Sequence, residues 1–362
     1  MKLGILGPPQ SGKTTLFAAL TRGHADSASS RGEKVHLGSV KVPDTRLDAL
    51  RDMYQPKKFT PAKVDYVDAP PGEATPGRAE RGALSALAAL RDVDAFVLVV
   101  RAFADPAVSH FRETIDPARD AAWLVSELLL EDLAVVERRI DRIEKSLKVG
   151  KKPEDPAEYE ALKLVMEALE NERPASSVPL NKPQERSLRG FRLLSACPWI
   201  LVVNADDEAM KQGEEALVAP VLAKLAEPRP PVIALSAKTE AELAALSDED
   251  AKEFMQVLGI KEPGLTRMIH LSYAALGLLS FFTVGPDEVR AWTVRDGALA
   301  PEAAGAIHSD LERGFIRAEA ISYEDLMKSG AMNKAKDQGL LRTEGKDYRV
   351  RDGDILNVRF SV

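Results

Sequence analysis

A glycine-rich stretch near the amino end has the residue types and spacing of a phosphate-binding loop. Residues 7–14 read Gly-Pro-Pro-Gln-Ser-Gly-Lys-Thr, which fits the pattern G-x-x-x-x-G-K-[ST]. In this pattern backbone N–H groups face a phosphate, the lysine contacts the β- and γ-phosphates, and the hydroxyl holds Mg²⁺. An apolar strand before the loop and a helix after it are expected, as the motif requires. The sequence predicts a nucleoside triphosphate site built from Gly7, Gln10, Ser11, Gly12, Lys13, Thr14 and Thr15.

An acidic residue at the end of a second expected strand completes a metal site. A sheet that carries a phosphate-binding loop needs a carboxylate at the tip of a neighbouring strand to hold Mg²⁺. Asp68 ends the apolar run 64–68 and meets that need. Thr14 and Asp68 are therefore the predicted magnesium ligands. The alternative for Asp68 is a strand-end residue that caps a turn.

Two later loops have residues that recognise a purine base. One apolar run ends in Asn204 and Asp207, in an N-x-x-D pattern, and another ends in Ser236, Ala237 and Lys238. An aspartate accepts hydrogen bonds from guanine N–H groups that adenine does not offer at the same edge. Each motif alone is weak, but both follow apolar strands in the expected order. We predict that these five residues bind the base of GTP or ATP.

The elements that position these residues alternate between strands and helices. Apolar runs typical of strands buried on both faces occur at 2–6, 64–68, 95–101, 199–204 and 232–236. Alternation of such runs with helices predicts an α/β fold, namely a doubly wound, mostly parallel sheet.

The region between the third and fourth of these strands is expected to be an inserted helical hairpin, residues 120–192. One helix carries an apolar seam with the spacing of a coiled coil, and a second helix follows a polar break. The seam consists of Leu129, Leu133, Val136, Ile140, Ile143 and Leu147. We favour an internal core for this seam; a partner-binding arm is the alternative.

The pattern changes again over residues 278–362. Short strand-like runs at 281–284, 289–294, 347–350 and 355–362 are separated by turn residues, whereas 302–339 is more helical. We predict a small α+β domain there. The expected domains are a nucleotide-binding domain in two parts (1–119 and 193–277), the hairpin (120–192) and the C-terminal domain (278–362).

Bulk properties restrict the class of protein. The 362 residues have a net charge of −7, which argues against a globally basic nucleic-acid binder, and we expect no DNA partner. No apolar run approaches the roughly 18 residues of a membrane span. The chain enters a strand directly, without a secretory signal. We therefore expect a cytoplasmic protein without a membrane partner.

The order of these motifs resembles a translation-factor-class GTPase, and the C-terminal block resembles the YchF subfamily of Obg-like P-loop NTPases. Phe-Phe-Thr-Val-Gly at 281–285 and Gly-Phe-Ile-Arg at 314–317 belong to the most similar part, 265–362. The resemblance covers nearly the whole chain. It implies a G domain, a coiled-coil insertion and a C-terminal TGS-like domain. It also implies use of ATP as well as or instead of GTP, and association with the ribosome, for which the C-terminal domain and the hairpin are the candidate contacts.

Contact with ribosomal RNA is suggested by five cations of the C-terminal segment: Arg342, Lys346, Arg349, Arg351 and Arg359. Acidic residues lie among them, so a charge-balanced, solvated face is the simpler interpretation.

The chain departs from the family pattern where the γ-phosphate is expected. The family has Asp-x-x-Gly, but residues 68–71 read Asp-Ala-Pro-Pro, and Gly72 follows one place later. Proline has no N–H to donate to the γ-phosphate, so Gly72 would have to shift inward to make that contact. Glu73 is the candidate for orienting the attacking water. Two functions therefore remain open: a slow hydrolytic switch, and a nucleotide-binding regulatory module with little or no hydrolysis.

The base-binding loops depart as well. Asp207 stands where the family has glutamate, which favours guanine, whereas Ala205 stands where guanine sites commonly have a lysine. The sequence leaves the choice between ATP and GTP open.

Overall fold

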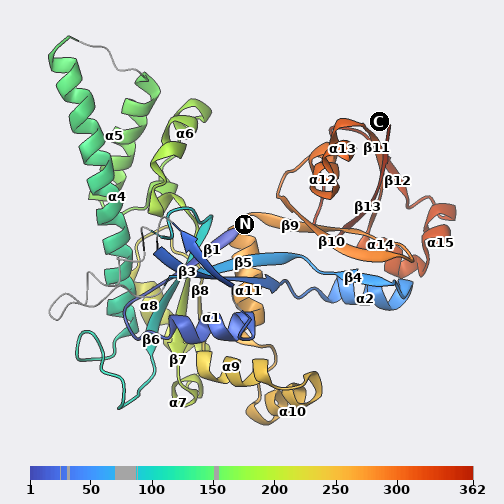
Figure 1. The fold of residues 1–362 in the computed structure, drawn as a ribbon, viewed down its shortest axis with the longest axis horizontal. Coiled ribbons are helices and arrows are strands. Elements are labelled where there is room, and N and C mark those ends of the chain that lie inside the picture. The colour runs from blue at the N-terminus through green and yellow to red at the C-terminus, as the bar shows by residue number, and fades with distance from the viewer. Residues whose placement is uncertain (25, 31–32, 70–86, 88, 151–154, 362) are drawn as a thin grey trace. The chain divides into compact units, whose positions relative to one another are not determined.

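The described residues of the computed structural model divide into two units, and each unit is considered by itself. Residues 1–24, 26–30, 33–69, 87, 89–150 and 155–361 are described (Figure 1). The first unit comprises residues 1–39 and 65–268, and the second comprises 40–64 and 269–362.

A seven-stranded sheet in the order β2-β3-β5-β1-β6-β7-β8 runs through the described part of the first unit. The strands are β1 (Lys2–Leu6), β2 (Asp26–Ser30), β3 (Glu33–Lys41), β5 (Lys63–Asp68), β6 (Ala95–Ala102), β7 (Trp199–Ala205) and β8 (Val232–Leu235). The five strands from β5 to β8 in this order are parallel, and β2 pairs with β3 in the antiparallel sense. The predicted α/β fold with a mostly parallel sheet is confirmed.

The helices of this unit follow the strands along the chain. They are α1 (Lys13–Thr21), α4 (Pro117–Lys148), α5 (Pro156–Glu170), α6 (Lys182–Leu188), α7 (Asp207–Met210), α8 (Glu214–Lys224), α9 (Ala237–Ala245) and α10 (Asp248–Leu258), with short 3₁₀ turns η1 (Ala175–Ser177), η2 (Arg189–Phe191) and η3 (Leu194–Ala196). Helix α11 (Gly264–Ala275) begins in the first unit and continues in the second. Because the carboxyl ends of parallel strands meet at one edge of a sheet, the loops after β1, β5, β6, β7 and β8 are brought together there.

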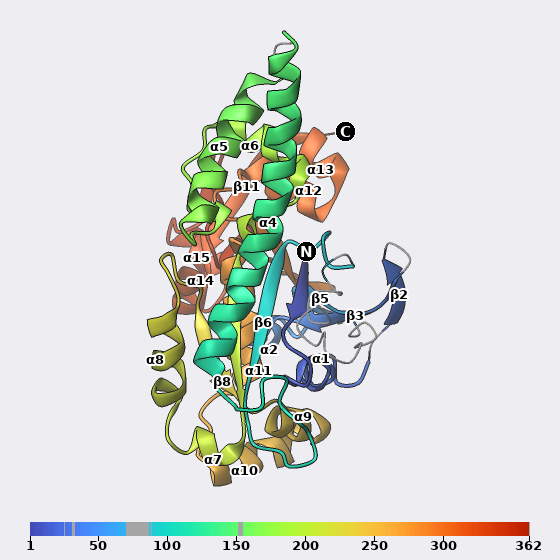
Figure 2. The ribbon, with the colours of Figure 1, turned by 90° about the vertical axis from the view of Figure 1, so that its left-hand side faces the viewer.

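The inserted helical hairpin consists of α4 and α5, which lie side by side in Figures 1 and 2. Asp116 and Asp155 cap the two helices, and each cap is followed by a proline at the start of the helix, where its missing N–H costs nothing. Val136, Ile140 and Ile143 of the predicted seam are buried. None of the described helices, the 32-residue α4 included, is long and apolar enough to cross a membrane.

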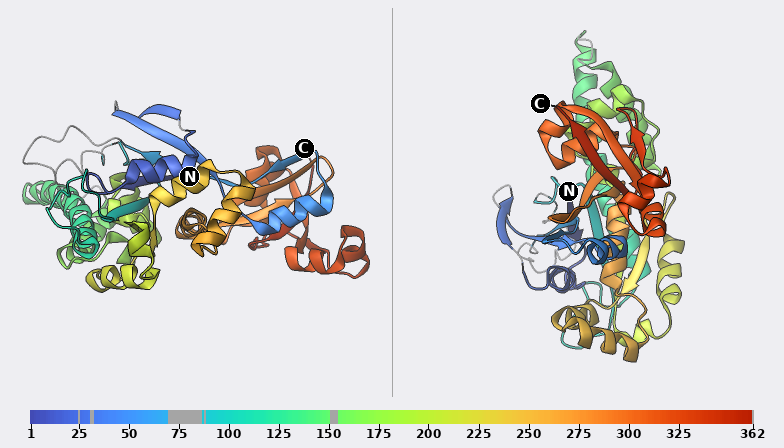
Figure 3. Two further views of the ribbon diagram at one scale, coloured as in Figure 1. Left: turned by 90° about the horizontal axis from the view of Figure 1, so that it is seen from below. Right: turned by 90° about the vertical axis from the view of Figure 1, so that its right-hand side faces the viewer.

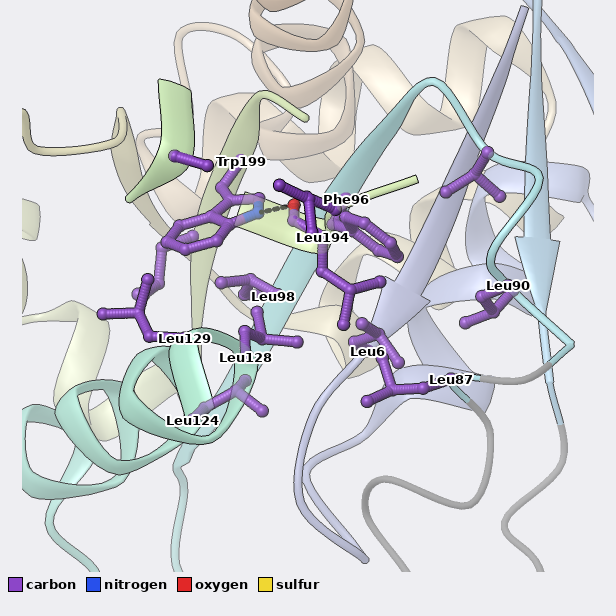
Figure 4. Close-up of a cluster of buried hydrophobic side chains, with 14 of the residues drawn as sticks. Leu6, Leu87, Leu90, Phe96, Leu98, Leu124, Leu128, Leu129, Leu194 and Trp199 are labelled. Atoms are coloured by element: carbon purple, nitrogen blue, oxygen red, sulfur yellow. Dashed lines mark hydrogen bonds between the residues drawn. The ribbon is translucent and has the colours of Figure 1, made fainter. Parts of the chain in front are cut away.

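The base of α4 packs into the core of the sheet (Figure 4). Leu124, Leu128 and Leu129 are almost fully buried in the same cluster as apolar residues of β6 and β7. The indole Nε1 of Trp199 donates to the carbonyl oxygen of Leu194 at 3.1 Å, so the polar atom of this large side chain is also satisfied. Burial of each leucine contributes about 1.5–3 kcal/mol relative to exposure, which fixes the helix to the nucleotide-binding sheet.

A second, mixed sheet in the order β12-β11-β13-β9-β10-β4 forms the described part of the second unit. Its strands are β4 (Lys58–Thr60), β9 (Leu278–Thr283), β10 (Glu288–Arg295), β11 (Phe315–Ser322), β12 (Arg342–Glu344) and β13 (Asp354–Phe360). Its helices are α2 (Thr45–Tyr54), α12 (Ala300–Ile307), α13 (Ser309–Arg313), α14 (Tyr323–Ser329) and α15 (Met332–Asp337). The predicted α+β character of the C-terminal region is confirmed.

The second unit also contains a segment from the first third of the chain. β4 pairs in parallel with β10 through the register Val289↔Phe59, and α2 lies beside this part of the sheet. In Figure 3 this light-blue segment lies against the orange strands. From the sequence, residues 40–64 are instead expected in the nucleotide-binding domain, and the C-terminal domain is expected to start at 278.

One local prediction for the C-terminal region is confirmed in the main, and another is wrong. Residues 302–339 are mostly helical, as expected, but they also contain β11, which was not predicted and pairs with β13 along most of its length. Residues 347–350 were expected to form a strand, but they carry one isolated bridge, Leu299↔Arg349. The Tyr348 hydroxyl instead donates to Asp354 Oδ2 at 2.7 Å, which holds this segment as a turn.

Candidate functional site

The predicted phosphate-binding loop connects β1 to α1 and leaves no room for a side chain at two of its glycines. A Cβ atom on Gly12 would lie 2.1 Å from Asn204 Nδ2, and one on Gly7 would lie 2.2 Å from the Val99 carbonyl oxygen. Gly12 also has a φ of 91°, in the left-handed region that glycine tolerates best. No side chain caps α1, so the N–H groups of its first turn are directed at whatever occupies the loop.

The Lys13 side chain spans the inside of this loop. Its ammonium Nζ donates to the carbonyl oxygens of Gly7 at 2.9 Å and Pro8 at 2.7 Å, and the residue is only 9% exposed. Burial lowers the pKa of Lys13 to about 8, while the nearby Asp68 carboxylate opposes this shift. The structure thus keeps a poorly solvated cation beside the uncapped start of α1, which is an arrangement suited to a polyphosphate.

Asp68 lies at the end of β5, beside the start of α1. The Thr14 hydroxyl donates to Asp68 Oδ2 at 3.2 Å. Burial raises the pKa of Asp68, and the hydrogen bond from Thr14 and the charge of Lys13 oppose this rise. Among the described residues, Asp68 Oδ1 and Ser11 Oγ are buried without a hydrogen-bond partner. A hydroxyl and a carboxylate with a free oxygen are the hard donors that Mg²⁺ prefers.

Asn204 braces the phosphate loop against the loop after β8. Its amide Nδ2 donates to the Ser11 carbonyl oxygen at 2.9 Å, and its Oδ1 accepts from the Ala237 N–H at 3.0 Å. Asn204 is almost fully buried, so both bonds form in a site of low dielectric. The two predicted base-binding loops and the phosphate loop therefore have a fixed spacing.

A second connection joins the predicted base-binding loops through Thr239. The Thr239 hydroxyl lies 2.5 Å from Asp207 Oδ1 and 2.9 Å from the Ser236 hydroxyl. Asp206, the residue before, caps α7 and accepts from the Ala104 N–H at 2.9 Å. The contact with Thr239 thus orients the Asp207 carboxylate and occupies one of its two oxygens.

Eight of the predicted residues, from all three loops, line one cavity of about 640 Å³, which lies within the range of roughly 300–1,000 Å³ typical of ligand pockets. They are Gln10, Gly12, Thr15, Asn204, Asp207, Ser236, Ala237 and Lys238. Gly7, Ser11, Lys13 and Thr14 do not line it. Two other predicted residues, Gly72 and Glu73, lie outside the described residues.

The loop after β6 also lines this cavity, although it was not predicted from the sequence. It contributes Phe103, Ala104, Asp105, Pro106 and Val108. The buried Arg101 side chain holds the loop through its Nε to the Phe103 carbonyl at 3.0 Å and its Nη1 to the Val108 carbonyl at 3.0 Å. The guanidinium also lies 4.4 Å from the centre of the Phe103 ring. An arginine at the end of an otherwise apolar strand was the available signal.

Comparison with known proteins identifies relatives that match along the whole chain. The ribosome-binding ATPase YchF of Bacillus subtilis is 41% identical over 363 residues, which covers 99% of this chain and 99% of that protein. The Escherichia coli O157:H7 protein of the same name is 36% identical and covers 100% of this chain and 99% of its own length. This chain belongs to the YchF family.

The family assignment agrees with two further comparisons. Residues 278–361 match the family model YchF-GTPase_C, which is described as a protein of unknown function (DUF933). The structure of the Schizosaccharomyces pombe YchF GTPase superposes with a TM-score of 0.82 at 30% identity, covering 99% of this chain and 97% of that one. The YchF resemblance inferred from the motifs, and the P-loop α/β class of the fold, are confirmed.

Proposed function

We propose that this YchF-family protein binds a purine nucleoside triphosphate with Mg²⁺, hydrolyses it slowly, and associates with the ribosome in a nucleotide-dependent manner. The observation that carries the proposal is the buried Lys13 ammonium in a loop whose Gln10 and Gly12 line the same cavity as both base-binding loops. The names of the relatives support it, because they are called ribosome-binding ATPases and a GTPase. A protein with this partner would work in the cytoplasm.

The phosphate end of the site would act mainly by position and charge. Lys13 would exchange its bonds to the Gly7 and Pro8 carbonyls for β- and γ-phosphate oxygens, and the amides at the start of α1 would take the β-phosphate. Phosphoryl transfer in such sites depends on positioning and electrostatic stabilisation, so this arrangement supplies much of what a slow hydrolase needs.

Thr14 and Asp68 would hold Mg²⁺, as the unpartnered Asp68 Oδ1 and the hydroxyl beside it suggest. The ion would neutralise charge on the phosphate oxygens. Gly72 would donate its N–H to the γ-phosphate, and Glu73 would orient the attacking water.

The base would enter the 640 Å³ cavity. Asn204 holds the two loops that would contact the purine edge, and Asp207 keeps one carboxylate oxygen that Thr239 does not engage. Backbone N–H groups at Ser236, Ala237 and Lys238 would meet the purine. The proposal includes both ATP and GTP as substrates of the protein.

Calorimetric titration and single-turnover hydrolysis test the proposal together. ATP, GTP and their diphosphates are titrated with and without Mg²⁺, and the turnover of each bound triphosphate is then followed with wild type, Lys13→Ala and the control Lys252→Ala. A rate that depends on Lys13 but not on Lys252 supports the hydrolase. Tight binding with turnover equal to that of Lys13→Ala would instead support the regulatory module, for which Pro71 is the motivating residue. Failure to bind either purine at millimolar concentration would overturn both.

Ribosome association needs its own measurement. The protein is sedimented with ribosomes in the presence of the triphosphate, the diphosphate or no nucleotide. The proposal expects binding that changes with the nucleotide, and binding that is the same in all three states would contradict it.

A further inference from the structure

The predicted base-binding loop 236–238 depends for its position on the two elements that it joins. The loop leaves β8 after Leu235 and passes directly into α9, which begins at Ala237. β8 is the last strand of its sheet in the described part of the chain, so one of its edges is not paired with another strand there. Both β8 and α9 are attached to the first turn of α11. The contacts that hold this turn therefore also hold the loop.

A buried carboxylate makes the attachment on the side of α9. Glu240 Oε1 accepts a hydrogen bond from the Gly264 N–H at 2.6 Å, and Glu240 is only 6% exposed. Burial raises the pKa of Glu240, and the N–H groups of Gly264 and Leu265 oppose this rise. The first N–H groups of a helix have no partner within it, so a carboxylate at this place caps α11. Glu240 thus joins the start of α9 to the start of α11.

The attachment on the side of β8 uses the backbone of Ala234. Its N–H donates to Glu214 Oε1 at 3.1 Å, and its carbonyl oxygen accepts from Arg267 Nη2 at 3.4 Å. Glu214 and Arg267 also pair with each other at 2.5 Å. A Cβ atom on Gly264 would lie 2.7 Å from the Leu235 Cβ, so the first turn of α11 packs directly against the last residue of β8.

The far end of α11 is fixed to the sheet of the second unit. α11 is one helix of 12 residues, and its part from residue 269 onward belongs to that unit. There the buried Tyr273 hydroxyl donates to Thr293 Oγ1 at 2.8 Å and lies 2.9 Å from the Ser280 hydroxyl. Thr293 and Ser280 belong to β10 and β9. A rigid secondary-structure element is one of the means by which distant sites are coupled.

We propose that Glu240 is a positioning residue for purine recognition, which fixes loop 236–238 on the first turn of α11, and that α11 couples occupation of the base cavity to the second unit. The inference rests on the proposed function, because it assumes that this loop contacts the purine. Coupling of this kind is reciprocal. A partner that displaces α11 in the second unit would therefore change the affinity for the purine nucleotide.

The chain offers a matched control on the same helix. Glu242 lies two positions after Glu240 on α9 and is exposed, and among the described residues no hydrogen bond or ion pair engages it. Replacement of either glutamate by methionine removes one carboxylate from α9 and keeps an unbranched side chain. Only the change at position 240 leaves the Gly264 N–H without its acceptor. A comparison of the two therefore separates the contact with α11 from the loss of a charge.

The first experiment compares the full-length wild type with Glu240→Met, Glu240→Gln and the control Glu242→Met. Calorimetry measures the affinity for ATP and GTP, and for inorganic tripolyphosphate, which has no base. Glutamine keeps an oxygen that can accept from the Gly264 N–H, so Glu240→Gln is the rescue variant. A thermal melt shows that each variant is folded.

We expect Glu240→Met to bind the purine triphosphates at least about tenfold more weakly than wild type, because a buried N–H loses a charged acceptor. The affinity for tripolyphosphate should not change, since the phosphate loop is not attached to Glu240. Glu240→Gln should recover most of the purine affinity, and Glu242→Met should behave as wild type. An equal loss for tripolyphosphate, or no loss for the purines, would overturn the proposal.

Gly264→Ala tests the same attachment from the side of α11 and leaves every charge in place. Its Cβ would displace the first turn of α11 from Leu235. The control is Gly190→Ala, since no atom lies within 4 Å of a Cβ built on Gly190. Gly264→Ala should lose purine affinity and keep tripolyphosphate affinity, while the control keeps both. Equal purine affinities for these two variants would contradict the proposed role of the first turn.

Hydrogen exchange tests the coupling to the second unit. Mass spectrometry follows the amides of residues 269–275 with no nucleotide and with a saturating purine triphosphate. In wild type and Glu242→Met, the nucleotide should slow their exchange, because α11 is held more firmly when the loop is occupied. This slowing should be lost in Glu240→Met. Exchange that the nucleotide does not change in wild type, or slows equally in Glu240→Met, would overturn the coupling.

The outcomes separate this inference from the proposed function. If wild type binds the purine triphosphates and Glu240→Met binds them equally well, the inference fails and the proposed function stands. If wild type binds them through Glu240 but neither hydrolyses them nor associates with ribosomes, the proposed function fails and the inference stands. If wild type binds no purine nucleotide, both fail.

Discussion

The two ends of the candidate nucleotide site are built in different ways. At the phosphate end, the contacts are local: Lys13 reaches carbonyls only five and six residues away, and the helix start that would bind phosphate follows directly in sequence. At the base end, the contacts are long-range. Asn204 bonds to Ser11, which is 193 residues distant, and to Ala237, which is 33 residues distant.

Because of this difference, the two ends of the site are expected to respond differently to substitutions. The phosphate end depends on backbone geometry, so a change of one atom at a glycine affects it directly. The base end depends on side chains that hold three loops at a fixed spacing, so it can weaken while the phosphate end stays intact. Inorganic tripolyphosphate probes the first end alone, and a purine nucleotide probes both.

The largest effect is expected where the two ends touch. Gly12→Ala would place a Cβ atom 2.1 Å from Asn204 Nδ2 at a residue whose φ is 91°. The left-handed conformation costs a residue with a Cβ roughly 1–2 kcal/mol, and displacement of Asn204 removes buried hydrogen bonds worth about 1 kcal/mol each. We expect affinity for tripolyphosphate and for the purine triphosphates to fall by roughly a hundredfold, as measured by calorimetry.

Gly23→Ala is the matched control for this change. Gly23 also has a positive φ, of 72°, but no atom lies within 4 Å of a Cβ built there. The control should keep nearly full affinity for both ligands. Loss of only the purine ligand in Gly12→Ala would show that the two ends are less coupled than the Asn204 contact implies.

The next effect concerns pH and should appear equally with both ligands. The free protein holds Lys13 with a pKa of about 8, and a bound polyphosphate would raise that value because it favours the charged form. Binding therefore takes up a proton above pH 8. We expect affinity to be constant between pH 7 and the pKa, and to fall by up to about tenfold per pH unit above it.

Titrating each ligand in the presence of EDTA, from pH 7 to 9.5, measures this effect without any bound metal ion. Lys13→Met should bind more weakly and show a flat profile, since it has no ammonium to titrate. A wild-type profile as flat as that of Lys13→Met would show that the ammonium does not meet the phosphates.

The same contrast between local and long-range contacts explains what the sequence could predict. The strands β1, β5, β6, β7 and β8 were predicted because each carries apolar residues in a short run, which in β6 and β7 is almost entirely buried. The hairpin was predicted from its apolar seam. Segment 40–64 was assigned to the wrong neighbours, because the pairing of the three-residue β4 with β10 depends on residues more than 200 positions away and leaves no local pattern.

The same contrast decides which residues of the candidate site could be predicted from the sequence. The phosphate loop could be predicted because its motif is contiguous, whereas Arg101 and the loop it holds were missed. No spacing rule indicates that one guanidinium will collect the carbonyls of Phe103 and Val108. β11 was missed for a related reason: its alternating pattern, Phe-Ile-Arg-Ala-Glu-Ala-Ile-Ser, lies between helical segments and becomes a strand by pairing with β13.

A medium effect, confined to the base end, is expected for Arg101→Met. The change removes hydrogen bonds to the carbonyls of Phe103, Asp105 and Val108 while keeping an apolar stem of similar length. The loop that lines the cavity would lose its anchor. Since hydrogen bonds to a charged group contribute about 1.5–3 kcal/mol each, we expect purine triphosphate affinity to fall by at least tenfold, with tripolyphosphate affinity unchanged.

Arg101→Lys is the companion variant, because it keeps the charge but cannot span three carbonyls with a planar fork. It should lose nearly as much purine affinity as Arg101→Met. Circular dichroism and a thermal melt show whether each variant is folded. A parallel loss of tripolyphosphate affinity in a folded variant would mean that the loop after β6 also shapes the phosphate end, against the proposed separation.

The smallest effect is expected at the connection between the two base-binding loops. Thr239→Val keeps the shape of the buried side chain but removes the hydroxyl that lies 2.5 Å from Asp207 Oδ1 and 2.9 Å from Ser236 Oγ. The Thr239 backbone N–H still bonds to Ser236, so α9 keeps its cap. One neutral-to-charged hydrogen bond is lost, and we expect purine affinity to fall by roughly two- to tenfold. Thr239→Ser restores the hydroxyl and should restore affinity.

If Asp207 contacts guanine, the loss of affinity in Thr239→Val should be larger for GTP than for ATP, because only guanine offers N–H donors to that carboxylate. Equal losses for the two nucleotides would assign Asp207 to loop structure alone.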